Sequence, residues 1–384
     1  MNFRIFPLLL FFALFAETAP ALEYIRFRHE DGKERNEEGR SMFEAPDGLA
    51  FQSRDGQVYA IKWNNLVSRK TDELPFVPYT KKEMLERLKI EFPPDEKYHY
   101  LDTHDSFIVV YTTSKPFAQW CENLLKRLHE QYVQHWKKRG VQLVKPEFIM
   151  VAIIFSNEER FRQYVKQDDA PLSKEQCAYY HKLTNRIAMY DMTEQQVFWE
   201  GNQRRIAPGD IQRFLSHPAS YNNVMTLVHE AVHQVGFNTG MHLRFTPSPV
   251  WLFEGLAVFH EVPDQRNYRD VGWTLGPHVN RPRLDQLRKY LNVPNRESPI
   301  QKMIQDDNLF RPATALDNYA LAWGLMYYLE RKRPQELAAY LKLHQEKTID
   351  SDDNAEERMK DFEACFGDDW DKFYRDFADF MRRL

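Results

Sequence analysis

The segment His229-Glu230-Ala231-Val232-His233 limits most narrowly what this chain can fold into, because two histidines stand four positions apart with a glutamate after the first. On a helix, positions i and i+4 lie on one face, so both imidazoles would face one metal ion. Glu230 would then lie beside the ion without binding it, where a general base takes a proton from a water molecule that zinc acidifies. The segment therefore predicts a helical metal site and metal-dependent hydrolysis.

The residues around this segment have the pattern of a helix with one buried face. Apolar residues recur there at spacings of three and four, namely at Val224, Val228, Ala231, Val232 and Val235. Asn222 or Asn223 would cap its amino-terminal end, and Gly236 would end it. We expect a helix over residues 222–235.

A catalytic zinc ion usually takes three protein ligands and keeps one position open, so a third ligand is needed. In the pattern H-E-x-x-H-x-x-G-x-x-H the glycine is present as Gly236, but Thr239 replaces the third histidine and is a poor zinc ligand. His242 does not fit that spacing, and we expect it at the surface or just outside the site.

Glu254 is the stronger candidate for the third ligand. It lies in Trp251-Leu252-Phe253-Glu254-Gly255-Leu256-Ala257, an apolar segment that reads as a buried helix after a Gly- and Pro-containing loop at residues 238–249. A buried carboxylate needs a compensating positive charge, which zinc would supply. Capping of a helix or pairing with an arginine is the alternative for this residue.

These motifs resemble those of the gluzincins, the metallopeptidases whose zinc ligands are two histidines and a downstream glutamate. The resemblance is strongest to the peptidase MA-like domain of an uncharacterised family of secreted bacterial proteins. It rests on HEAVH, on the later W-L-x-E-G-x-A element and on residues 319–329, which are similar to the Y-A-x-A-W…Y-L helix of that domain. The motif core covers residues 222–330. The chain lacks the G-x-M-E-N segment with which M1 aminopeptidases hold a substrate amino terminus.

The resemblance implies a role for each matching residue. His229, His233 and Glu254 would bind one Zn²⁺ per chain, and Glu230 would be the general base. Tyr319 would donate a hydrogen bond to the oxyanion, the stabilising contact that such a site still lacks. Tyr327 and Tyr328 are expected in the core. His260 and Glu261 are expected at an exposed helix end, and the alternative is that they contact the metal ligands.

The amino terminus predicts secretion. Arg4 precedes a short apolar run at residues 5–16, and Ala19-Pro20-Ala21 supplies small residues for signal-peptidase cleavage. We expect residues 1–21 to be a signal peptide and the mature protein to lie in the periplasm, the cell envelope or the extracellular space. The apolar run is shorter than the roughly 20 residues of a membrane span, so no stable span is expected after cleavage.

Composition excludes some partners and leaves the cysteines open. The formal net charge of −4 gives no electrostatic basis for binding nucleic acid. Cys121, Cys177 and Cys365 are too few and too scattered for a disulfide framework, and one bridge with a free thiol or three thiols both fit. The expected partner is a protein or peptide substrate.

The pattern along the chain predicts two domains. Short strands at residues 24–28, 49–52 and 58–63, with a turn at Asp55-Gly56, indicate a small β-rich domain over residues 22–80. A charged helix at residues 81–90 and Pro93-Pro94 follow, and we place the boundary between residues 71 and 95.

The larger domain, residues 95–384, has an α+β pattern. Strands are expected at residues 107–112, 149–155 and 186–190, with a long helix at 118–139 between the first two. After residue 222 the chain reads as mostly helical and closes with an amphipathic helix at 370–381. The expected fold class is α+β: a zincin-like metallopeptidase domain with a mixed sheet and a helical carboxyl-terminal half, preceded by the small β domain. Zincin topology would place the strand at 186–190 along the substrate cleft, where its edge would pair with an extended peptide.

Two functions from different classes fit the sequence. The first is a secreted zinc-dependent peptidase, a hydrolase that cleaves peptide bonds with metal-activated water. The second is a catalytically inactive binding or scaffold protein of the cell envelope that keeps the zincin fold. The first is favoured, because a structural zinc site has no use for Glu230.

Overall fold

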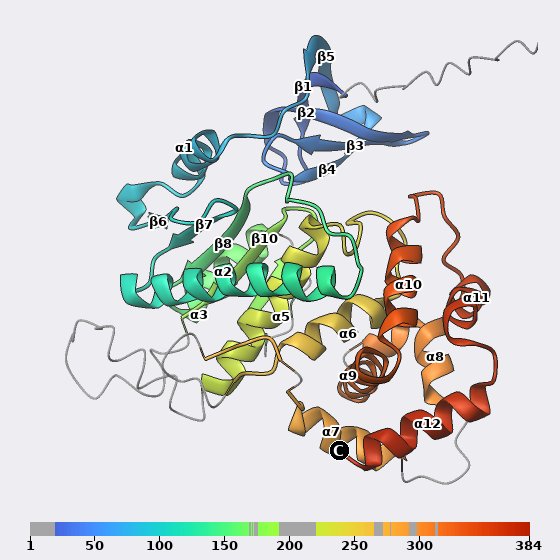
Figure 1. The fold of residues 1–384 in the computed structure, drawn as a ribbon. Helices are drawn as coiled ribbons and strands as arrows, with labels where there is room; N and C mark the ends of the chain where they lie inside the picture. The colour runs from blue at the N-terminus through green and yellow to red at the C-terminus, as the bar shows by residue number, and fades with distance from the viewer. Residues whose placement is uncertain are drawn as a thin grey trace, which may run out of the picture. The chain divides into compact units, whose positions relative to one another are not determined.

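The computed structural model describes residues 20–168, 170, 172, 176–191, 220–264, 272–276, 278–291, 298–311 and 314–384 (Figure 1). The predicted leader lies outside these residues except for positions 20 and 21, and Ala21 is the first residue of strand β1. The chain divides into two compact units, Met1–Pro78 and Tyr79–Leu384. Among the helices that the structure describes, none has the length and apolar character needed to cross a bilayer.

The first unit contains an antiparallel five-stranded sheet in the order β4-β3-β2-β1-β5. The strands are β1 (Ala21–Arg28), β2 (Glu34–Ala45), β3 (Gly48–Ser53), β4 (Val58–Lys62) and β5 (Leu66–Pro75). Its core is the apolar cluster of Ile25, Phe27, Leu49, Phe51, Tyr59 and Ile61. The turn at Asp55-Gly56 joins β3 to β4, and Gly56 has a φ of 86°, a left-handed conformation that suits glycine.

The second unit begins with α1 (Lys81–Glu91) and contains a mixed five-stranded sheet in the order β6-β7-β8-β10-β9. The inner strands β7 (Phe107–Tyr111), β8 (Met150–Phe155) and β10 (Arg186–Tyr190) run parallel. The outer strands β6 (His99–Leu101) and β9 (Ala178–His181) run antiparallel to their neighbours.

Alternate side chains of the sheet enter two separate cores, as expected where both faces are covered. Ile108 and Val110 point to the face packed by α1 and α3 (Glu158–Gln167). Phe107 and Val109 point to the opposite face, where α2 (Lys115–Lys138) and α5 (Ser220–Asn238) lie.

The carboxyl-terminal half is helical. Helix α9 (Ala315–Lys332) packs against α6 (Val250–His260), α7 (Arg281–Leu291) and α8 (Pro299–Gln305). It also contacts α10 (Pro334–Gln345) and α12 (Trp370–Arg382), and α11 (Ala355–Phe366) packs against α10 and α8. Tyr327 and Tyr328 are 4% and 6% exposed, which confirms their predicted place in the core. The chain is therefore α+β, with a β-rich amino-terminal unit and a helical carboxyl-terminal half.

Candidate metal centre

Helix α5 carries His229, Glu230 and His233 on consecutive turns, and it is longer at both ends than the sequence predicted. It already includes Ser220, so Asn222 and Asn223 lie inside the helix rather than at its cap. It also continues through Gly236 to Asn238.

The prediction that Gly236 ends α5 was wrong, because the helix continues through this glycine to Asn238 and a Cβ here would make only ordinary contacts. A Cβ at Gly236 would lie 3.4 Å from Cδ2 of His242 and 3.4 Å from the hydroxyl of Tyr132. The left-handed glycine is Gly240, with a φ of 76°, two residues beyond the end of the helix.

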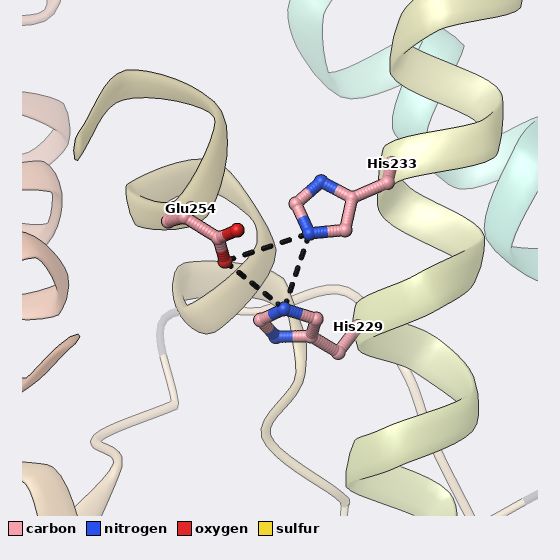
Figure 2. A group of neighbouring side chains, drawn as sticks. All are labelled: His229, His233 and Glu254. Carbon is pink, nitrogen blue, oxygen red and sulfur yellow. Dashed lines mark hydrogen bonds and ion pairs between the residues drawn. The ribbon is translucent and has the colours of Figure 1, made fainter. Parts of the chain in front are cut away.

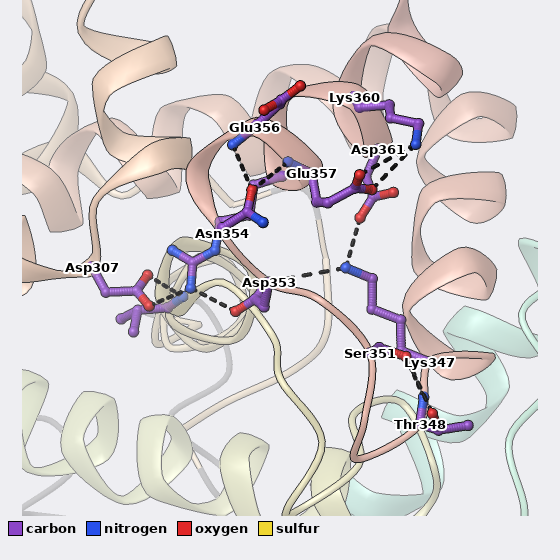
Figure 3. A network of polar contacts seen from close by, with 12 residues as sticks. Asp307, Lys347, Thr348, Ser351, Asp353, Asn354, Glu356, Glu357, Lys360 and Asp361 are labelled. Carbon is purple, nitrogen blue, oxygen red and sulfur yellow. Dashed lines mark hydrogen bonds and ion pairs between the residues drawn. The ribbon is translucent and has the colours of Figure 1, made fainter.

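Helix α6 carries Glu254 and is held at its first turn by a side chain from elsewhere in the chain. Pro249 precedes the helix and offers no side-chain cap, and the backbone N–H of Val250 donates instead to Oδ1 of Asp307, at 2.9 Å. Nη2 of Arg358 lies 2.7 Å from Oδ2 of Asp307 and 2.6 Å from Oδ2 of Asp353 (Figure 3). An anion at a helix amino terminus is stabilising, so this network fixes the start of the helix that presents Glu254.

The three predicted ligands converge on one point (Figure 2). Oε2 of Glu254 lies 3.2 Å from Nε2 of His229 and 3.5 Å from Nε2 of His233. The two Nε2 atoms are 3.1 Å apart. Two imidazole nitrogens and one carboxylate oxygen form a donor set that zinc commonly takes, and one coordination position would remain for water or substrate.

The position of Glu261 shows which nitrogen of His229 faces this point with a lone pair. Nδ1 of His229 lies 2.8 Å from Oε2 of Glu261, and a carboxylate accepts hydrogen bonds, so Nδ1 carries the proton. In the neutral ring, Nε2 then presents a lone pair to Oε2 of Glu254, a buried oxygen that has no hydrogen-bond partner among the described residues. A positive charge is needed between these atoms, supplied either by a proton on the imidazole, which the 3.2 Å ion pair allows, or by a metal ion, and the two nitrogens and one oxygen fit zinc.

The electrostatics of the centre point the same way. Burial lowers the pKa of His229, but the neighbouring carboxylates of Glu254 and Glu261 outweigh burial and hold that pKa well above its ordinary value. Burial raises the pKa of Glu254, but the charges of His233 and His229 outweigh it and hold the pKa well below its usual range. The site therefore favours a positive charge between these side chains.

The prediction that His260 and Glu261 lie at an exposed helix end was wrong, and for Glu261 the alternative, a contact with the predicted ligand His229, is what the structure shows. Glu261 is 2% exposed, and its Oε1 accepts a hydrogen bond from Nδ2 of Asn280 at 3.0 Å and lies 3.6 Å from Nε of Arg283. His260 is 4% exposed and accepts a hydrogen bond from Nε1 of Trp136 at 3.2 Å. Residues far along the chain cover this end of α6, which its own sequence does not reveal.

Glu230 is held at the edge of the sheet. One of its oxygens, Oε2, accepts a hydrogen bond from the backbone N–H of Tyr180 in β9, at 2.8 Å. Burial raises the pKa of Glu230 above its ordinary value, against the opposing charges of His229 and His233. A carboxylate with a raised pKa is a more effective general base near neutral pH.

Tyr319 begins the second turn of α9 and faces the same centre. Its ring lies 6.2 Å from the His229 ring and 5.3 Å from Cζ of Arg283. Burial, the charges of Glu254 and Glu230 and a hydrogen bond to Glu254 raise the pKa of Tyr319 above its ordinary value. The phenol therefore keeps its proton at neutral pH and remains a hydrogen-bond donor.

The strand beside the site is β9 and not the predicted one. Residues 186–190 form β10, but β8 and β9 pair with its two edges, so no extended peptide would add to it. β9 is the outer strand of the described sheet, and it is the strand that contacts Glu230. Its four residues are too short a run for alternation in the sequence to reveal.

The remaining candidates lie outside the centre. His242 is 4% exposed, neither of its ring nitrogens has a hydrogen-bond partner among the described residues, and it is not among the three converging side chains. Cys121, Cys177 and Cys365 are all free thiols. Sequence reasoning had no signal for Tyr180, Asn280 or Asp307, because their contacts join segments far apart in the chain.

Comparison with known proteins adds one family and no assigned function. Residues 223–350 match the family described as "Protein of unknown function (DUF1570)". The match begins inside α5, ends beyond α10 and covers about a third of the chain, including His229, Glu254 and Tyr319. No curated protein matches the chain.

Proposed function

We propose that this chain is a zinc-dependent peptidase of the gluzincin type, with a zincin-like fold over residues 95–384. The observation that carries the proposal is the convergence of His229, His233 and Glu254, with a buried Glu254 oxygen that has no hydrogen-bond partner among the residues the structure describes. The contact between Glu261 and Nδ1 of His229 supports it, because metal-binding histidines usually donate their other N–H to such a group.

His229, His233 and Glu254 would hold one Zn²⁺ per chain. When bound, zinc supplies a positive charge that acidifies a water molecule and polarises a carbonyl group. Glu230 takes the proton from the attacking water. Because Tyr180 holds Oε2 of Glu230, the carboxylate is already oriented, and its other oxygen is left to accept the proton.

Tyr319 would stabilise the oxyanion that forms on the peptide carbonyl. Its phenol is protonated for the reason given above, and its ring packs beside His229 and Phe310, which limits its motion. A preorganised donor aimed at developing negative charge typically contributes about a hundredfold or more to the rate.

The substrate would bind as an extended strand along β9. Along β9, the backbone groups of successive residues point alternately toward β10 and away from it. The backbone N–H of Tyr180 points away from β10, toward Glu230. The outward edge of β9 thus runs past the general base. Because Glu230 occupies the N–H of Tyr180, an extended substrate would pair with the other outward groups of β9 and bring a peptide bond to the metal centre. We place the mature protein in the periplasm, the cell envelope or the extracellular space, on the strength of its leader sequence.

The test combines metal content with peptide cleavage. We expect about one zinc per wild-type chain by mass spectrometry, loss of zinc in a His229→Ala/His233→Ala double variant, and weakened binding in Glu254→Ala. Glu230→Gln should keep the zinc and lose cleavage of a peptide library. Cleavage by zinc-loaded Glu230→Gln would contradict the mechanism, and zinc binding without cleavage by wild type would favour the inactive binding or scaffold protein.

A further inference from the structure

Lys182 is a cation beside the proposed metal centre that has no carboxylate partner in the described structure. It is the first residue after β9, on the turn that leads to β10. Its Nζ lies 4.5 Å from the ring centroid of Phe237 and 4.5 Å from that of Phe253. No carboxylate of the described residues forms an ion pair with this amine, although the charges of Glu254 and Asp307 act on it at longer range.

The two rings that hold Lys182 belong to the helices that carry the metal ligands. Phe237 lies one turn beyond His233 on α5, and Phe253 directly precedes Glu254 on α6. The Phe253 ring is 5.8 Å from the His233 ring. Lys182 is therefore one side chain away from the metal centre, on the side of His233, whereas Tyr319 lies on the side of His229.

The turn that carries Lys182 is held in place. Nε of Arg244 donates to the carbonyl oxygen of Lys182 at 3.0 Å, and Nη2 of Arg244 donates to that of Leu183 at 3.1 Å. The Tyr180 ring stacks on Phe237 at 5.8 Å, so Tyr180 and Lys182 point to the same face of the sheet. A second positive charge at Arg244 adds to the local attraction for an anion.

We propose that Lys182 recognises an acidic side chain of the substrate, on the amino-terminal side of the bond that is cleaved. The proposal rests on the proposed function. A peptide that adds antiparallel to β9 runs in the opposite direction, so the residues opposite Lys182 precede those opposite Tyr180. Since Glu230 contacts Tyr180, the scissile bond lies near Tyr180, and the acidic residue lies one or two positions before it.

The Lys182 amine is largely buried, and a buried positive charge is stabilised by a nearby anion. Burial lowers the pKa of Lys182, and the aromatic rings compensate the charge only in part. Among the acidic groups, Glu254 has the strongest charge interaction with Lys182, and in the proposed peptidase its carboxylate is engaged by the metal. A glutamate of the substrate would supply a charge-assisted hydrogen bond.

The first measurement is cleavage of matched peptide libraries by the zinc-loaded protein. The libraries are decapeptides that are random except for one central Glu, Gln or Lys, and mass spectrometry locates the cleaved bonds. For wild type we expect the Glu peptides to be cleaved roughly tenfold or more faster than the Gln peptides, one or two bonds after the Glu. Lys182→Met should remove that preference, Lys182→Glu should favour the Lys peptides, and Lys342→Met, a control on α10 with a 71% exposed lysine, should change nothing.

The second measurement needs no turnover. Fluorescence anisotropy measures binding of the labelled Glu and Gln libraries to Glu230→Gln, with and without Lys182→Met. Tighter binding of the Glu library that is lost with Lys182→Met supports recognition of an acidic side chain by Lys182. If wild type then cleaves no peptide, the proposed function fails, and only this recognition stands, without a place relative to a cleaved bond. The subsite would be overturned if the Glu and Gln libraries were cleaved and bound equally well, or if Lys182→Met weakened cleavage and binding of both libraries equally. Cleavage of either library by wild type would still support the proposed peptidase.

Discussion

The contact between Glu261 and His229 makes a quantitative prediction about metal affinity. In Glu261→Gln the side chain keeps its shape and one acceptor oxygen, but it loses the negative charge that Nδ1 of His229 faces at 2.8 Å. A neutral acceptor makes a weaker hydrogen bond, and His229 becomes a poorer ligand. Loss of such a partner typically weakens metal binding about 10- to 100-fold, which corresponds to roughly 1.4–2.8 kcal/mol.

The assay is a zinc titration at neutral pH against a chromophoric chelator of known affinity. We expect Glu261→Gln at the lower end of that range and Glu261→Ala at the upper end, because alanine also leaves the Nδ1 proton and Asn280 without their acceptor. Kinetics are not needed, so the result does not depend on knowing the substrate.

Glu330 provides a matched control. Its side chain is 3% exposed, as is that of Glu261, and it pairs with Arg139 and lies 3.8 Å from Nε2 of His135. Glu330→Gln therefore removes an equally buried charge beside another histidine and should lower stability without changing zinc affinity. A Glu261→Gln protein that is folded and binds zinc within a factor of about three of wild type would refute the reasoning from the proton on Nδ1.

Three further predictions concern stability. Burial lowers the pKa of His344 to about 3, so between about 6.5 and 3 the unfolded chain binds a proton that the folded chain does not, and stability falls as pH falls. Between pH 7 and pH 4.5, the free energy of unfolding measured in urea should fall by on the order of 2 kcal/mol less in His344→Phe than in wild type. An equal fall in both proteins would contradict this. Asp307→Ala removes the acceptor of the Val250 N–H and should cost about 1 kcal/mol of unfolding free energy, and no measurable loss would show that α6 needs no such contact. A Cβ at Gly255 would lie 3.3 Å from the backbone oxygen of Ala322, so Gly255→Val should destabilise by roughly 1–3 kcal/mol, and an unchanged melting temperature would mean that α6 and α9 can separate.

The parts of the fold that the sequence predicted are those in which pattern and contact coincide locally. The helix around His229 was predicted because apolar residues and ligands repeat along the same helical face. Helix α12 was predicted at residues 370–381 for the same reason and spans Trp370–Arg382. In both, burial on one face produces the periodicity that is read from the sequence.

Strands β2 and β5 were not predicted, because burial leaves no periodic pattern in their sequences. β2 and β5 are rich in charged residues, and most positions of β5 are exposed, so no alternation of apolar and polar residues marks them. Their pairing with β1 on both sides, rather than their own composition, makes them strands.

The candidate site likewise contains residues that spacing in the sequence predicted and residues that it did not. His229, Glu230, His233 and Glu254 lie on two helices that follow one another in the chain, so spacing alone brought them into one hypothesis. Glu261 was assigned to an exposed end because a charged residue after an apolar helix usually lies there. In the structure, Asn280 and other residues far along the chain bury Glu261, and no spacing in the sequence connects these residues to α6.

The error at Gly236 has the largest consequence for the proposed function, because the three extra residues at the end of α5 help to join the candidate metal centre to the turn after β9. Asn238 donates from Nδ2 to Oδ1 of Asn185 at 2.7 Å and accepts from its Nδ2 at 2.9 Å, and Nε2 of Gln234 donates to the carbonyl of Asn185 at 2.9 Å. Asn185 ends the turn after β9 in a left-handed conformation, with a φ of 59°. A helix that stopped at residue 235 would keep the Gln234 contact with this turn but lose the paired amide contact of Asn238. Since the same helix carries His229 and His233, the reciprocal amide contact joins the predicted metal ligands to the turn after β9, and in the proposed peptidase it would help to place a bound peptide relative to the metal.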